Sequence, residues 1–136
     1  MKIRVYSTVV AALGAVMVGV LLLYTTWWAD AVNLLMPDFT YRTQTIIVTT
    51  LQFAVCSFLI AVTARRNSIL FAFLGMSIYE CLMLASVVAF NHNYPQNCIE
   101  YSWSTFFGDL GGAAALAAMS WLTWRGFLQE RPQNAT

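Results

Sequence analysis

Three polar side chains each lie inside a different long apolar run of the sequence: the acids Glu80 and Asp109, which could exchange protons, and the uncharged amide Gln52. The run around Glu80, residues 68–90, is apolar apart from this carboxylate and a few small hydroxyls. At a rise of roughly 1.5 Å per residue, a helix of this length could cross the ~30 Å hydrocarbon core of a bilayer. Glu80 would then lie near the midplane, where an ionised carboxylate costs at least a few kcal/mol unless it is paired or protonated.

The positions of these residues along their runs predict a shared depth. Counted from the outer ends at roughly 1.5 Å per residue, Asp109 would lie about 10 Å, Gln52 about 12 Å and Glu80 about 15 Å into the membrane. Helical side chains lean toward the N-terminus of their own helix, which tilts the two acids apart. Gln52 lies between them in depth and can both donate and accept. We therefore predict a polar cluster of Gln52, Glu80 and Asp109 inside a helix bundle, with Ser77 and Thr105 nearby.

Three interpretations of this cluster stay open. No basic residue occurs within the apolar runs, so the two acids lack a charged partner in their own chain. Burial and mutual repulsion then favour one protonated acid, which could relay a proton or exchange it for a cation. Alternatively, protonated acids hydrogen-bond the helices together, or the acids pair with an arginine or lysine of a partner subunit.

The elements that would position the cluster are four apolar runs. The chain has 136 residues, of which 60% are hydrophobic and 10% charged, and its mean hydropathy is +0.66. Soluble domains carry about 25% charged residues, so lipid is the expected solvent for most of this chain. We predict an all-α fold, an integral membrane four-helix bundle. It would be a single domain, residues 1–136, with spans at about residues 5–27, 44–64, 68–90 and 102–124.

Basic residues predict the orientation of the bundle. With four spans, one side would hold Lys2, Arg4, Arg65, Arg66, Arg125 and Arg131, and the other side only Arg42. Since positively charged loops stay in the cytoplasm, we expect an up-down-up-down bundle with cytoplasmic N and C termini, in the plasma membrane. The first run resembles a signal peptide, but its roughly 20 apolar residues exceed the 7 to 15 of a signal-peptide core, so we expect it to be retained.

Small residues in the last run form a second feature. Gly108, Gly111, Gly112 and Ala115 include a GxxxG pattern, which lets two membrane helices approach closely. We expect a close helix–helix contact at these residues, either within the chain or between chains.

Several classes of function are not indicated by the sequence. The three cysteines form no CxxC or metal-ligand spacing, and the single histidine, His92, cannot supply both axial ligands of a bis-histidine haem. A net charge of +1 without a basic cluster does not suggest nucleic acid as a partner. Because there is no nucleotide-binding loop and no nucleophile paired to a base, we expect no enzymatic activity, no metal and no cofactor.

Two hypotheses of function follow. The first is a small multi-pass membrane protein that contacts lipid and other membrane helices, as an accessory or assembly subunit or as a homo-oligomer. Its short loops leave mainly its lipid-plane faces for binding. The alternative is a small proton- or cation-coupled transporter or channel that uses Glu80 and Asp109.

Overall fold

Four long helices make up most of the chain. The computed structural model describes residues 2–35 and 40–129, and within these ranges it contains helices and no strand. The prediction of an all-α fold is therefore confirmed for the described residues. The long helices are α1 (Lys2–Leu35), α2 (Tyr41–Ala64), α3 (Ser68–Asn93) and α4 (Trp103–Thr123). Short turns of other helical types follow α2, α3 and α4: η1 (Arg65–Asn67), η2 (Pro95–Asn97) and the π-helical η3 (Trp124–Leu128).

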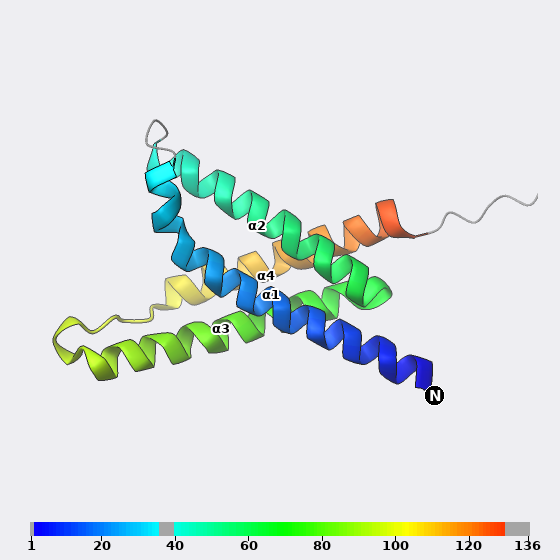
Figure 1. Cartoon of the computed structure of the whole chain (residues 1–136), viewed down its shortest axis with the longest axis horizontal. Coiled ribbons are helices and arrows are strands. Elements are labelled where there is room, and N and C mark those ends of the chain that lie inside the picture. The colour runs from blue at the N-terminus through cyan, green and yellow to red at the C-terminus, as the bar shows by residue number, and fades with distance from the viewer. Residues whose placement is uncertain (1, 36–39, 130–136) are drawn as a thin grey trace, which may run out of the picture.

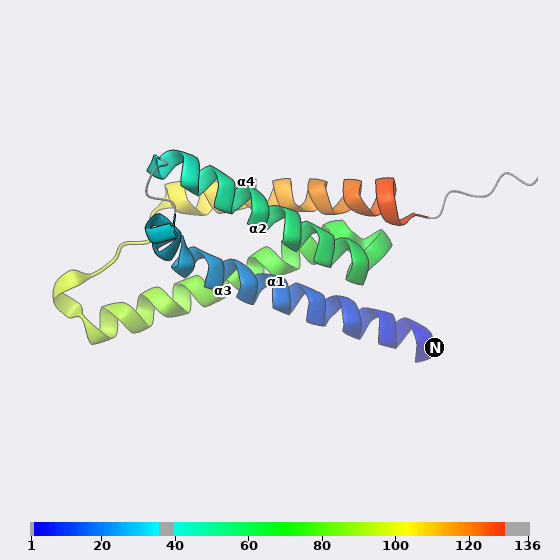
Figure 2. The same cartoon turned by 45° about the horizontal axis from the view of Figure 1, so that its top comes forward.

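The helices run alternately in opposite directions (Figure 1 and Figure 2). α1 packs against α2 and α3, and α4 packs against the same two helices. The N-terminal end of α1, the corner between α2 and α3, and the C-terminal end of α4 lie at one end of the molecule (Figure 1). The described part of the chain thus has the up-and-down order of helices that the lengths of the apolar runs predict. Three helices extend past the expected spans: α1 runs from Lys2 to Leu35, α2 begins at Tyr41, and α3 continues to Asn93.

Polar residues start two of the helices, and a three-residue corner joins α2 to α3. The side chain of Thr40 accepts a hydrogen bond from the Thr43 N–H at the start of α2, and Ser102 accepts from the Thr105 N–H at the start of α4. At the corner, Arg65 has φ 48° and ψ −117°, a conformation that non-glycine residues rarely adopt. This tight reversal makes α2 and α3 an antiparallel hairpin.

The interior of the bundle is built mainly from small residues. The largest fully buried side chains are those of Ile60, Leu116 and Val18. Where α1 crosses α3, a Cβ placed on Gly19 would lie 2.6 Å from the Ile78 Cγ2 and 3.1 Å from the Gly75 carbonyl oxygen. Only glycine therefore allows these two backbones to lie as close as they do.

The outside of the bundle carries the large apolar side chains. Val88, Leu70 and Leu51 are 68%, 67% and 62% exposed. Two stretches of the described chain, Ser7–Tyr24 and Arg42–Asn93, are long and apolar enough to cross a membrane, and the second comprises α2, η1 and α3. The composition of this surface suggests contact with lipid.

The α1–α3 contact predicts opposite effects for the same substitution at two glycines. Gly19→Ala forces a methyl group into Ile78 and should lower the free energy of unfolding by about 1–3 kcal/mol. The matched control is Gly111→Ala on α4, where nothing lies within 4 Å of the added carbon. This change should be neutral or stabilise the helix by up to about 1 kcal/mol. Thermal unfolding in detergent measures both, and equal destabilisation by the two variants would contradict the close α1–α3 contact.

Candidate functional site

The connection between α3 and α4 is closed by one asparagine side chain. The Asn91 Nδ2 donates to the Ile99 carbonyl oxygen at 3.0 Å, and the Ile99 N–H donates to the Asn91 Oδ1 at 2.8 Å. Because both hydrogen bonds join the last turn of α3 to the same loop residue, the loop folds back toward the bundle. Tyr101, two residues later, is held between α3 and α4.

Tyr101 connects the two acids of the apolar helices. Its hydroxyl group donates to the Glu80 Oε2 on α3 at 2.5 Å, and the Asp109 Oδ2 on α4 lies 3.4 Å from the same hydroxyl oxygen. Tyr101 and both acids are partly buried. We call Glu80, Tyr101 and Asp109 the tyrosine-bridged acid pair.

The pair has fewer donors than acceptors. One hydroxyl hydrogen serves two carboxyl groups, and the Glu80 Oε1 is buried without a hydrogen-bond partner in the described part of the chain. Two carboxylates this close repel each other, and a proton held between them removes the repulsion. The arrangement is therefore suited to binding one proton or a small cation.

Asp109 lines two cavities. One, of about 190 Å³, lies between α3 and α4 and is lined also by Glu80 and Ser77. The other, of about 320 Å³, is lined by residues of all four long helices, including Gln52 and Tyr79. Asp109 thus connects a groove between two helices with the interior of the bundle.

The structure places the other residues of the predicted polar cluster differently. The Gln52 Nε2 donates to the Leu22 carbonyl oxygen of α1 at 3.3 Å, so this amide shares a cavity with Asp109 but bonds to another helix. Ser77 donates to the Phe73 carbonyl oxygen one turn earlier in α3. Thr105 interacts with Ser102 at the start of α4, and no hydrogen bond between it and either acid is present in the described chain.

The small residues of α4 also divide into two groups. A Cβ on Gly112 would lie 3.4 Å from the Phe53 ring, an ordinary contact inside the bundle. Gly108 and Gly111 have nothing within 4 Å, and Ala115 is exposed. Gly111 and Ala115 therefore face outward from the described chain, whereas Gly108 is exposed but also lines the cavity of about 320 Å³.

Tyr101 is the residue of the site that sequence reasoning missed. It lies in the loop, one residue before the cap of α4 and outside the apolar runs that contain the predicted polar cluster. Tyr101 could have been predicted from its chemistry. Two acids without a basic partner need a hydrogen-bond donor, and a tyrosine at a helix boundary can extend its hydroxyl group toward the bundle.

Comparison of this chain with known proteins identifies no relative. No family model, curated protein or solved structure matches this chain. Within residues 2–35 and 40–129, no group of three or more histidine, cysteine or acidic side chains could hold a metal ion.

The hydrogen bond of Tyr101 predicts a pH-dependent loss of stability. The bond to Glu80, followed by burial, raises the pKa of the Tyr101 hydroxyl group, so the folded protein favours the neutral phenol. Tyr101→Phe removes the donor and should lower the free energy of unfolding by about 1–3 kcal/mol at neutral pH. Because the folded-state pKa is the higher one, the difference between wild type and variant should be constant between neutral pH and about pH 10, the ordinary pKa of tyrosine, and shrink above it.

Denaturant unfolding of both proteins across this pH range measures that difference. Tyr94→Phe, at an exposed loop residue, is the matched control and should change nothing. A difference between wild type and Tyr101→Phe that grows above pH 10 would contradict the assigned hydrogen bond.

Proposed function

We propose that this chain is a four-span membrane protein that acts through lateral contacts of α4 with a helix of another chain, as an accessory or assembly subunit or as a homo-oligomer. Its place would be the plasma membrane, with both termini in the cytoplasm. It would act without enzymatic chemistry or a cofactor.

Burial supports the membrane location. Only 33% of the Ser7–Tyr24 stretch and 22% of the Arg42–Asn93 stretch are buried, whereas the core helix of a soluble protein is mostly buried. α4 is not one of these two stretches, but its 21 residues extend roughly 32 Å at 1.5 Å per residue, and it packs beside α2 and α3. A membrane that α2 and α3 cross would therefore also surround α4.

The distribution of charge supports the orientation. Arg4, Arg65, Arg66 and Arg125 belong to the end of the bundle that carries both described chain ends, whereas Arg42 starts α2 at the opposite end. A bias of this kind retains the basic end in the cytoplasm.

The main support for the proposed lateral contact is the open space beside two glycines of α4. Gly108, Gly111, Ala115 and Ala118 are spaced by three or four residues and are all exposed, which defines the outer α4 face. A glycine in a helix interior is up to about 1 kcal/mol less favourable than alanine. Gly108 and Gly111 make no close packing contact in the described chain that would offset this penalty. Close approach of a second membrane helix would offset it.

The outer α4 face can be blocked without disturbing the bundle. In Gly108→Leu and Gly111→Leu the first side-chain carbon has nothing within 4 Å, so each variant should fold as the wild type does and lose its partner chain. Ala85→Leu adds the same kind of bulk at an exposed position of α3 and is the matched control. Purification in a mild detergent with native mass spectrometry reports the bound chains. Retention of the partner by the double glycine variant would contradict the proposal.

A second candidate function has its own observation. Asp109 lines both cavities and shares the Tyr101 hydroxyl with Glu80, which supports proton or cation transfer through the tyrosine-bridged acid pair. Protonation of a carboxyl pair at this depth is a common basis for ion coupling.

Substitution of Glu80 separates the two functions. If the chain transports protons, Glu80→Gln should abolish proton flux in liposomes and leave chain association unchanged, because it keeps the side-chain volume and removes the titrating group. The matched control is Glu100→Gln, at an exposed loop carboxylate. Flux that is unchanged in Glu80→Gln would exclude transport through the acid pair.

A further inference from the structure

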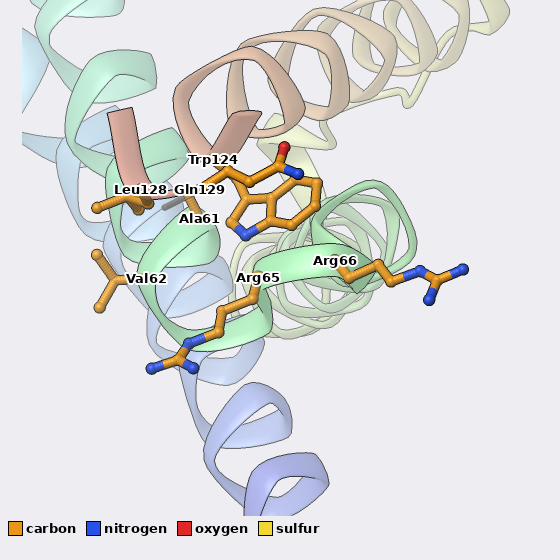
Figure 3. Close-up of a pocket in the computed structure, with 7 residues that line it drawn as sticks. All are labelled: Ala61, Val62, Arg65, Arg66, Trp124, Leu128 and Gln129. Atoms are coloured by element: carbon orange, nitrogen blue, oxygen red, sulfur yellow. The ribbon is translucent and has the colours of Figure 1, made fainter. Parts of the chain in front are cut away.

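A pocket with two arginines lies at the end of the bundle opposite the acid pair. It has a volume of about 490 Å³ and is formed where the end of α2 and the η1 corner meet η3. Figure 3 shows the Trp124 ring beside the corner and the two arginine side chains extending to opposite sides. We call it the arginine pocket, and its lining is Ala61, Val62, Arg65, Arg66, Trp124, Leu128 and Gln129.

The positive charge of the pocket is not neutralised by the described chain. Arg65 and Arg66 are both exposed, and neither has an ion-pair partner among residues 2–35 and 40–129. A guanidinium group carries several N–H donors in a planar fork that fits phosphate oxygens. The pocket therefore has charge and donors for an anionic phosphate group.

The remaining walls are apolar. Ala61, Val62 and Leu128 line the pocket on the side of α2 and η3, and the Trp124 indole adds a large flat ring with one N–H donor. A free phosphate ion would gain nothing from these walls. A phospholipid would use both, with its phosphate at one guanidinium group, the charge of the other arginine nearby, and the start of an acyl chain along Val62 and Leu128.

Two backbone features shape the pocket. Arg65 is held at φ 48°, a costly conformation for a residue with a side chain. On the facing side, the π-helical turn closed by the Gln129 N–H and the Trp124 carbonyl oxygen at 2.8 Å widens the end of α4. Wide turns of this type occur often at functional sites.

We propose that the arginine pocket binds the headgroup of an anionic phospholipid in the cytoplasmic leaflet. The inference rests on the membrane location proposed above and is independent of the outer α4 face. Basic pockets between membrane helices on this side are a recurrent lipid-recognition feature.

The test compares two lipids with the same acyl chains, dioleoylphosphatidylglycerol and dioleoylphosphatidylcholine. The full-length protein is released from nanodiscs of the equal mixture, and the lipids that stay bound are counted by native mass spectrometry. Wild type should retain the anionic lipid in excess. Arg65→Gln and Arg66→Gln should each reduce that excess about fivefold, the equivalent of about 1 kcal/mol per arginine.

Three controls make the outcome decisive. Arg42→Gln removes one charge at the other end of the bundle, and Arg125→Gln removes one at the same end, where this guanidinium lies 4.8 Å from the centre of the Trp121 ring. Both should keep the lipid excess, and added inorganic phosphate should not displace the lipid.

Undiminished lipid excess in the Arg65→Gln/Arg66→Gln variant, or equal loss in the Arg42→Gln and Arg125→Gln controls, would overturn the proposal. Displacement of the lipid by inorganic phosphate would also overturn the proposal, because the pocket would then bind phosphate without requiring a lipid. Failure of the wild-type chain to enter nanodiscs would refute the membrane location itself. If the chain enters nanodiscs but retains the two lipids equally, only the proposed lipid binding by the arginine pocket is refuted.

Discussion

The close contact between α1 and α3 at Gly19 and Gly75 is the constraint on which the rest of the bundle depends. It brings two backbones together where a single added methyl group would collide with Ile78. Dispersion between closely spaced backbones then adds to the burial of side chains such as Ile60 and Leu116 in holding the helices together. The large apolar side chains are left on the outside, where only a solvent such as lipid accommodates them without penalty.

The same constraint explains how the two ends of the bundle acquire different chemistry. α2 and α4 follow the α1–α3 pair, which places Glu80 beside Asp109 and brings the η1 corner against η3. At one end, a loop closed by Asn91 returns a hydroxyl group to two acids. At the other, two arginines that have no ion-pair partner among residues 2–35 and 40–129 lie next to an indole and apolar walls. An acid pair and a basic pocket thus lie at different depths of one small bundle.

Much of the architecture could be predicted from the sequence because it depends on the lengths of apolar runs. Four such runs and the three residues Arg65–Asn67 are enough to give the helices and the hairpin. The partners of the helix faces could not be predicted in this way. Gly108 belongs to a GxxxG pattern yet has nothing within 4 Å, whereas Gly19, at the same four-residue spacing from Ala15, forms the tightest part of the α1–α3 contact. The spacing of small residues identifies a helix face that permits close approach. Which element packs against that face depends on how each helix is rotated about its axis.

The candidate site also divides into features that the sequence predicts and features that it does not. Counting residues along a helix gives depth, and the depths estimated for Glu80 and Asp109 agree with their shared hydroxyl partner. Counting does not give the direction in which a side chain points. For this reason Gln52, predicted at the same depth, bonds to α1, and Tyr101, a loop residue, supplies the donor.

The most direct measurement of the proposed placement in lipid is labelling of single cysteines in intact cells with a membrane-impermeant thiol reagent. With Cys56 and Cys81 replaced by alanine, Cys98 is the exposed thiol in the connection after α3. Asn67→Cys with Cys98→Ser in the same background reports the opposite end of that helix. We expect the reagent to label Cys98 in intact cells and to label position 67 only after the membrane is opened. Labelling of both positions in intact cells would show that α3 does not cross the membrane and would contradict the proposed four-span bundle.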